Sequence, residues 1–167
     1  VGSHLVEYLF NKYKKSEIVV YDKITYAAKL ENLKKIRKSK RLKIIVADIL
    51  DYKKLYKYTK NVDLLIHAAA ESHVDRSFAL NKNFIQTNVM GTRNVMEASK
   101  INKIKKIIHV STDEVYGEIH KGKFNENSTL NPSNPYSSSK AAAEMVINGY
   151  IHSYKLPVII IRGNNIF

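Results

Sequence analysis

Short apolar runs alternate along the chain with longer stretches in which apolar residues recur at helical spacing. The runs are typical of buried strands and cover residues 17–21, 42–46, 62–67, 105–110 and 158–162. The longer stretches predict helices at 3–14, 52–58, 83–100 and 135–154, with room for a short helix at 30–38. This alternation predicts an α/β domain, a doubly wound parallel sheet with helices on both faces.

The end of the predicted strand at 105–110 carries the strongest candidate chemistry. Residues 111–117 read Ser-Thr-Asp-Glu-Val-Tyr-Gly, so Thr112, Asp113 and Glu114 fall where the strand ends. Ligands of open α/β sheets bind at the carboxyl ends of strands. The position therefore favours a catalytic role over an exposed acidic turn.

A tyrosine and a lysine follow at a spacing that has its own chemistry. Tyr136 and Lys140 lie four residues apart, on one face of the helix predicted for 135–154. Tyrosine ordinarily titrates near pH 10, so the Lys140 ammonium and a positive nicotinamide ring would both lower the pKa of Tyr136 toward that of a general base. The spacing alone also fits a solvated helix face, but the neighbouring strand end favours catalysis.

The first residues suggest a dinucleotide site. Asp22 ends a predicted strand 20 residues after Gly2. In a Rossmann unit an acidic residue at this distance from the glycine turn binds the adenosine ribose, which favours NAD over its phosphorylated form. Alternatively, Asp22 and Lys23 form an ordinary strand-end turn, and Lys23 would tolerate a 2'-phosphate. The other glycines of the turn are absent from the sequence, so we expect the first Rossmann strand to precede it.

Two further strand ends fit a dinucleotide crevice. Ala69 and Ala70 follow a strand, and their small side chains would let the backbone approach a pyrophosphate; tight packing is the alternative. Asp48 follows another strand, where it would meet the adenine amino group while Ile49 packs against the ring. Asp48 would equally serve as the N-cap of the helix that begins near Tyr52.

Composition excludes several function classes. The chain has 167 residues and no cysteine, which excludes disulfides, thiol nucleophiles and thiolate zinc sites, and its six histidines lack the HExxH spacing. We therefore predict no metal, and residues 73–75 are predicted to be a loop. The net charge of +13 would attract polyanions, but the lysines are scattered and no nucleic-acid motif accompanies them. We expect a cytoplasmic protein with neither a specific nucleic-acid partner nor a membrane partner.

Together these motifs resemble the extended short-chain dehydrogenase/reductase family, and within it the nucleotide-sugar 4,6-dehydratases acting on dTDP-glucose or UDP-glucose. The resemblance spans nearly the whole chain. It is carried by Val1–His4, Asp22–Ala27, Asp48-Ile49, Ala69–Ser77, Thr87–Thr92, Ser111–Gly117, the Tyr136/Lys140 pair and Arg162–Asn165. The Asp113-Glu114 pair is the specific part, because related epimerases and decarboxylases generally lack an acid and a base there.

The resemblance implies an NAD-binding Rossmann domain over 1–167 and a role for each site residue. Tyr136 takes the proton of the sugar C4 hydroxyl as hydride leaves C4 for NAD, Lys140 lowers the phenol pKa and holds the nicotinamide ribose, and Thr112 hydrogen-bonds the C4 oxygen. Glu114 then removes the C5 proton and Asp113 protonates the departing C6 hydroxyl. The substrate contacts implied by the resemblance are Ser72, Thr112 and Asn164, and the cofactor contacts are Gly2, Asp22, Lys23, Asp48, Ile49, Ala69, Ala70, Thr87, Tyr136, Lys140 and Asn165.

The family continues beyond Phe167 into a domain that grips the nucleotide-sugar. We therefore expect a fragment truncated at both ends that is by itself inactive and poorly stable, and a homodimer when full length. The alternatives are an NAD-dependent nucleotide-sugar epimerase, for which Glu114 would have no use, and a non-catalytic NAD-binding or polyanion-binding module, which the net charge motivates.

Overall fold

The computed structural model describes residues 1–119 and 121–164. The strands are β1 (Ile18–Asp22), β2 (Leu42–Val46), β3 (Leu64–His67), β4 (Lys106–Thr112) and β5 (Val158–Gly163). The α-helices are α1 (Gly2–Lys12), α2 (Tyr52–Tyr58), α3 (Val74–Ala79), α4 (Asn81–Phe84), α5 (Thr92–Ile101) and α6 (Pro135–Tyr154). Three further helical segments are not α-helical: the 3₁₀ turns η1 (Leu30–Leu33) and η3 (Asp113–Tyr116), and the π-helical segment η2 (Ile85–Gly91).

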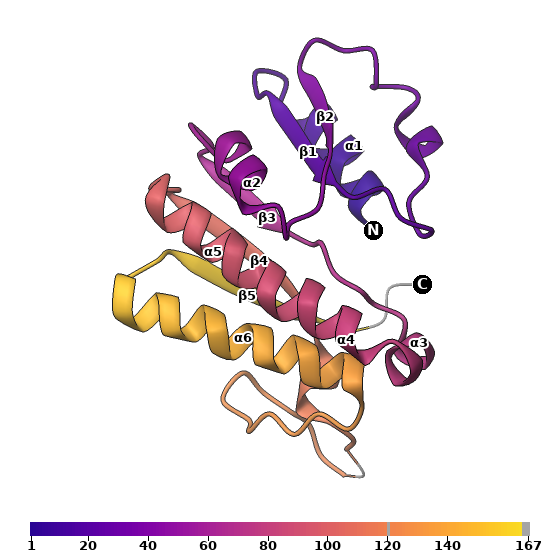
Figure 1. Cartoon of the computed structure of the whole chain (residues 1–167), viewed down its shortest axis with the longest axis vertical. Helices are drawn as coiled ribbons and strands as arrows, with labels where there is room; N and C mark the ends of the chain where they lie inside the picture. The colour runs from indigo at the N-terminus through magenta and orange to yellow at the C-terminus, as the bar shows by residue number, and fades with distance from the viewer. Residues whose placement is uncertain (120, 165–167) are drawn as a thin grey trace.

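All strand pairs are parallel, as the alternating pattern predicts. β1 pairs with β2, and β4 lies between β3 and β5 (Figure 1). These two groups correspond to positions 3-2 and 4-5-6 of the Rossmann strand order. Among the described residues no strand pairs with both β1 and β3, so position 1 of that order is not filled by them. The parallel direction places the carboxyl ends of the strands in each group at one edge.

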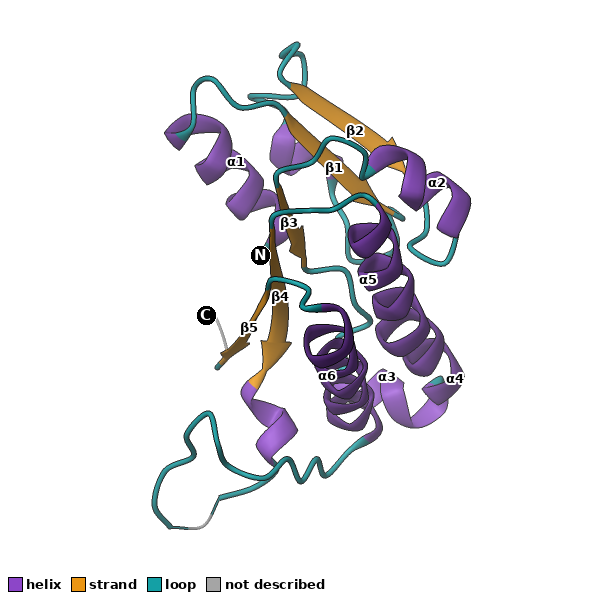
Figure 2. Cartoon of the chain, turned by 90° about the vertical axis from the view of Figure 1, so that its left-hand side faces the viewer, coloured by secondary structure: helices purple, strands orange, loops and turns teal. Residues whose placement is uncertain are grey.

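Helices cover both faces of the strands, so the predicted doubly wound architecture is confirmed. Figure 2 shows α1 on one side and α2, α5 and α6 on the other. On the first side Leu33, Ile36 and Leu42 form an apolar cluster against which residues of α1 pack. On the second side a larger cluster includes Leu55 of α2, Met96 of α5 and Ile147 of α6. No helix among the described residues has both the length and the apolar character needed to span a membrane.

The helix predicted at 83–100 is interrupted, which is a correction. Residues 85–91 form the π-helical segment η2 between α4 and α5. Within it Asn88 is buried and bonds residues outside the helix, and Gly91 packs so closely on Ile49 that a Cβ there would overlap its side chain. π-Helical turns inside α-helices often mark functional sites.

Two smaller predictions also differ from the structure. The short helix expected at 30–38 is only the 3₁₀ turn η1. The loop expected at 73–75 is wrong, because Val74 and Asp75 begin α3, with His73 as its N-cap. Asp75 supplies an acidic first turn, which is favourable at a helix N-terminus.

Candidate active site

The strand end predicted to be catalytic is shaped by Thr112. It is the last residue of β4, and its hydroxyl accepts the backbone N–H of Glu114 at 3.3 Å and so caps η3. The same hydroxyl donates to Asp113 Oδ1 at 3.4 Å. Asp113 and Glu114 therefore leave the sheet together in the first turn of η3, half-buried.

The start of α6 brings Tyr136 to this strand end. Asn134 forms a capping box with Ser137, and Pro135 occupies the first helical position, where its fixed φ favours helix. The side chain of Asn134 also donates to Glu114 Oε2 at 3.3 Å. Tyr136 is only 9% exposed and lies close to the Thr112 side chain. The structure thus brings together Thr112, Glu114 and Tyr136, as the sequence predicts.

The electrostatics of Tyr136 differ from the prediction. The sequence predicts a lowered pKa, whereas burial raises the pKa of Tyr136; the nearby Thr112 hydroxyl lowers it, and the Glu114 and Asp113 carboxylates raise it further. The reason is that the phenol is taken out of water beside two acidic groups. A lowered pKa would need a positive charge that faces the phenol from outside these residues.

Lys140 lies on the same helix face but bonds elsewhere. It is 4% exposed, and its ammonium donates to the Val110 carbonyl at 2.7 Å. Burial lowers the pKa of Lys140 to about 8, while the Glu144 carboxylate acts in the opposite direction. A lysine with this pKa gains and loses its proton near neutral pH, which suits a group that moves protons.

An exposed carboxylate and an ion pair lie at the end of β1. Asp22 is exposed, and its Oδ1 accepts the backbone N–H of Ile24 at 2.7 Å. Lys23 Nζ lies 2.7 Å from Asp48 Oδ2 at the end of β2. The ion pair raises the pKa of Lys23. Burial acts to raise the pKa of Asp48, but the bonds from Lys23 and from the Leu50 N–H outweigh it and keep that pKa below its ordinary value.

One expectation about this region is corrected. The N-cap of α2 is Asp51, whose side chain accepts the Lys54 N–H at 3.0 Å, so Asp48 does not cap this helix. Ile49 has its side chain in the apolar core at 7% exposure, against Gly91, and its contact with an adenine ring stays a prediction. Asp48 caps its own turn instead, because its Oδ1 accepts the Leu50 N–H at 2.9 Å.

The chain after β3 is fixed by a residue that the sequence does not single out. Ala69 and Ala70 are half-buried, and the next residue, Glu71, bonds Asn88 through both its N–H and its carbonyl, at 2.8 and 3.0 Å. Asn88 also donates to Ser139 Oγ of α6 at 2.8 Å. The small residues are thus held at the strand edge with their backbone in a defined place.

The remaining predicted residues are spread around this edge. Gly2 is exposed at the start of α1, Ser72 is exposed before α3, and Thr87 is half-buried in η2. Asn164 lines the cavity described below, and Asn165 lies outside the described residues. Within the described residues no three acidic, histidine or cysteine side chains form a metal site.

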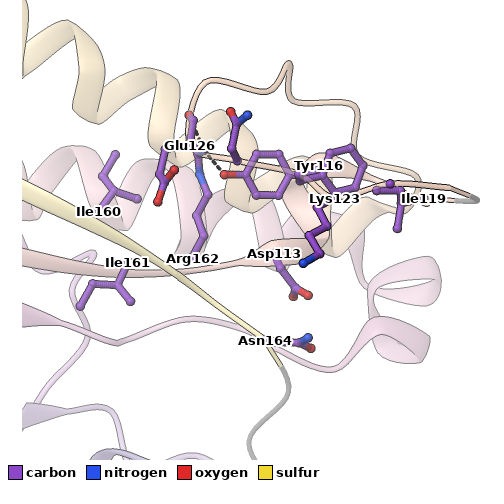
Figure 3. Close-up of a pocket in the computed structure, with 12 residues that line it drawn as sticks. Asp113, Tyr116, Ile119, Lys123, Glu126, Ile160, Ile161, Arg162 and Asn164 are labelled. Carbon is purple, nitrogen blue, oxygen red and sulfur yellow. Dashed lines mark hydrogen bonds between the residues drawn. The ribbon is translucent and has the colours of Figure 1, made fainter.

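An open cavity of about 880 Å³ lies beside η3. Figure 3 shows Asp113, Tyr116, Lys123, Arg162 and Asn164 among its lining residues, from η3, the polar insert at 118–134 and β5. The sequence does not single out Lys123 or Tyr116 for a role. The cavity gives the Asp113 side of the turn access to a ligand.

Gly117 is the C-cap of η3, and its replacement is expected to destabilise the protein. Its φ is +81° with ψ −160°, a conformation almost limited to glycine, and a Cβ would overlap the Asn131 carbonyl oxygen. We expect Gly117→Ala in the full-length protein to lower the free energy of unfolding by roughly 1 to 3 kcal/mol. Gly122→Ala is the control, because Gly122 also has positive φ but open space around it. Equal loss in the two variants, measured by denaturant unfolding, would contradict the overlap.

Two neighbouring buried histidines are expected to make the protein acid-sensitive. His67 and His109 face each other from β3 and β4 with ring centroids 5.0 Å apart. Burial lowers the pKa of His67 to about 3, and the Lys140 ammonium acts in the same direction. Burial also lowers the pKa of His109 to about 2, with the same help from His67 and Lys140. Each therefore binds a proton only after unfolding, so below about pH 6.5 stability falls by roughly 1 kcal/mol per pH unit for each histidine.

The measurement is the free energy of unfolding of the full-length protein between pH 7 and pH 4. His109→Leu should make the acid loss shallower, because both His109 ring nitrogens lack a hydrogen-bond partner among the described residues. Replacement of the exposed His152 by Gln serves as the control and should keep the wild-type slope. An unchanged slope in His109→Leu would show that this histidine is not buried neutral.

Comparison with known proteins gives a consistent match over the chain. A family model described as GDP-mannose 4,6 dehydratase matches residues 1–166. The dTDP-D-glucose 4,6-dehydratase of Dictyostelium discoideum is 43% identical over 181 residues, which cover 100% of this chain and 42% of that protein. The chain therefore spans about half the length of the curated relatives it matches.

Solved structures give the same picture. The dTDP-glucose 4,6-dehydratase of Streptomyces venezuelae, with NAD bound, superposes with a TM-score of 0.92 at 39% identity, over 96% of this chain and 51% of that chain. The UDP-glucuronic acid 4-epimerase of Bacillus cereus, in complex with UDP-glucuronic acid and NAD, gives a TM-score of 0.90 at 29% identity, over 97% and 52%. The Rossmann-like fold is therefore shared by dehydratases and epimerases.

Proposed function

The chain belongs to the GDP-mannose 4,6 dehydratase family, and from this membership we propose that residues 1–167 are the NAD-binding Rossmann domain of a nucleotide-sugar 4,6-dehydratase. Its substrate would be dTDP-glucose or UDP-glucose, and its product the 4-keto-6-deoxy sugar. One observation carries the proposal. Tyr136 lies close to Thr112, and Asn134 next to it in the chain donates to Glu114. The proposed base for oxidation, Tyr136, and the proposed base for elimination, Glu114, therefore lie at the same strand end.

The strand edge fits an NAD molecule. When bound, NAD would accept a hydride from the sugar C4 and return it to C6, which regenerates it in each turnover. The exposed Asp22 carboxylate suits the adenosine ribose hydroxyls, and Ala69 and Ala70 suit the pyrophosphate. Lys23 is already paired with Asp48, which disfavours a 2'-phosphate and supports NAD over its phosphorylated form.

Oxidation at C4 needs a base on the sugar hydroxyl. Tyr136 would take that proton, and the neighbouring Thr112 hydroxyl would hold the C4 oxygen in line with it. The raised pKa of Tyr136 sets a requirement: the phenol becomes a base only when positive charge faces it, and the nicotinamide ring would supply that charge. Lys140, whose ammonium bonds the Val110 carbonyl at 2.7 Å, would hold the nicotinamide ribose.

Elimination of water needs a base and an acid on neighbouring carbons. The 4-keto group acidifies the C5 hydrogen; Glu114 would take that proton, the C5=C6 double bond would form, and the C6 hydroxyl would leave as water with a proton from Asp113. The bond from Asn134 to the Glu114 carboxylate and the Thr112 cap on the Glu114 N–H fix the position of Glu114 beside Asp113.

An epimerase is the rival activity, because the Bacillus cereus epimerase has nearly the same fold. It would use Tyr136 and Lys140 but would have no role for Glu114 as a C5 base. The test is an assay of the full-length protein with UDP-glucose and dTDP-glucose in parallel. A 4-keto-6-deoxy product from either sugar supports the dehydratase; a C4 epimer supports the rival; inertness toward both overturns the proposal.

We further propose a cytoplasmic homodimer when full length, in which η2 and α6 contact the partner. Ile85, Met90 and Met145 are exposed apolar side chains on these segments, and α5 and α6 lie side by side in both views (Figures 1 and 2). Sedimentation analysis of the full-length protein tests this, and Met145→Lys should weaken association. We also propose that the 167-residue chain alone is inactive; cofactor-dependent turnover by it would contradict this.

A further inference from the structure

A buried ion pair lies behind the catalytic turn, and the proposed mechanism does not use it. Glu144 of α6 is fully buried, and its Oε2 lies 2.7 Å from Nη2 of Arg162 on β5. Arg162 Nε donates to both carboxylate oxygens, at 3.1 and 3.2 Å. Ser111, near the end of β4, donates a short hydrogen bond to Glu144 Oε1. Several charge-assisted bonds thus compensate the loss of water around a buried charge.

The third nitrogen of Arg162 points from this pair to the catalytic turn. Nη1 donates to the Tyr116 hydroxyl at 2.6 Å and to the Glu126 carbonyl at 3.2 Å (Figure 3). The guanidinium carbon also lies 4.8 Å from the centroid of the Tyr116 ring, and Phe124 stacks on that ring at 5.0 Å. Arg162 therefore connects β5 and α6 with η3 and the polar insert.

Tyr116 closes the turn that Asp113 and Glu114 open. The near end of η3 is fixed by the Thr112 cap and by Asn134, which bonds Glu114. Its far end has the backbone bond from Gly117 N–H to the Glu114 carbonyl and the side-chain bond of Tyr116. A 3₁₀ turn of four residues has weak hydrogen-bond geometry of its own, so side-chain anchors at both ends decide where it lies.

The other reacting group has a different support. Tyr136 is placed by the capping box at the start of α6 and by the edge of the Phe84 ring at 6.3 Å. Loss of the Tyr116 anchor should therefore move the two carboxylates and leave Tyr136 in position.

We propose that Tyr116, anchored by the Glu144–Arg162 ion pair, is a positioning residue for the Asp113–Glu114 turn and acts on water elimination rather than on oxidation at C4. The proposal rests on the proposed dehydratase function for its kinetic consequence, and on the contacts above for its structural one. A displacement of about 1 Å in a reacting group can slow a step about 100-fold.

Tyr116→Phe is the deciding variant, because it removes one hydroxyl and keeps the ring, its stack on Phe124 and the buried ion pair. In single turnovers of the full-length protein we expect elimination to slow by roughly 10- to 100-fold, while the first hydride transfer keeps its wild-type rate. Reduced cofactor should therefore build up. Tyr150→Phe is the matched control, because its hydroxyl donates to Glu97 Oε2 at 2.9 Å at the far end of α6; both of its rates should stay at wild type.

Wild-type rates of both steps in Tyr116→Phe, or equal slowing of both, would overturn the proposal. Amide hydrogen exchange without substrate separates this from a failure of the proposed function. Exchange at residues 113–117 should rise in Tyr116→Phe and in Arg162→Lys, and stay unchanged in Tyr150→Phe. Unchanged exchange in Tyr116→Phe overturns the positioning role whatever the substrate is. Raised exchange in a protein that dehydrates neither sugar keeps the anchor and contradicts only the dehydratase function.

Discussion

Replacement of Glu114 by glutamine in the full-length protein is expected to stop the reaction after its first step. Glutamine keeps the shape of the side chain and its bond with Asn134 but cannot take the C5 proton. Oxidation by Tyr136 should continue while elimination slows by roughly 10² to 10⁴-fold, the usual effect of losing a positioned general base. Enzyme-bound NADH, followed by its absorbance in a single turnover, should accumulate.

Exchange of the C5 hydrogen with deuterated solvent gives a second readout for this variant. Glu114→Gln should lose the exchange, whereas Glu118→Gln, which changes an exposed glutamate just after the turn, should exchange at the wild-type rate. Wild-type exchange in Glu114→Gln would show that another group is the C5 base and that the assignment of Glu114 is wrong.

Replacement of Tyr136 by phenylalanine is expected to block the reaction before any NADH forms. The change removes the phenol hydroxyl and leaves the ring contact with Phe84. Because Tyr136 is the proposed base for the C4 hydroxyl, the first hydride transfer should slow by roughly 10² to 10⁴-fold. Substrate-dependent absorbance of NADH at early times measures this step.

The exposed Tyr154 on the same helix provides the control for this variant, and Tyr154→Phe should form NADH at the wild-type rate. Rapid NADH formation by Tyr136→Phe would contradict the role of Tyr136 as base. Glu114→Gln and Tyr136→Phe thus have opposite effects on the same signal, because they act on successive steps.

Most of the fold follows from local pattern, and the exceptions are tertiary. The strands at 42–46 and 105–110 and the helix at 135–154 are readable because each needs one buried face. The π-helical segment η2 is not readable, because it depends on Asn88 reaching Glu71 and on Gly91 fitting against Ile49. Those contacts join residues that no local periodicity relates.

The candidate site divides in the same way. Thr112, Glu114 and the Tyr136/Lys140 spacing are visible in the sequence, because a strand end and a helix face place them. The direction of the Tyr136 pKa and the bond of Lys140 to Val110 depend on burial, which the sequence does not give. The third member of the helical series, Glu144, stands four residues after Lys140, and its partner Arg162 comes from another strand.

The fate of the C4 hydrogen is the most direct test of the central claim, that these residues carry out an oxidation, an elimination and a reduction in sequence. The full-length protein should be given dTDP-glucose or UDP-glucose labelled with deuterium at C4, and its product examined by mass spectrometry and NMR. The account predicts a 4-keto-6-deoxy sugar with that deuterium at C6 and solvent hydrogen at C5. A product that retains the deuterium at C4 with inverted configuration, or unchanged sugar from both substrates, would contradict it.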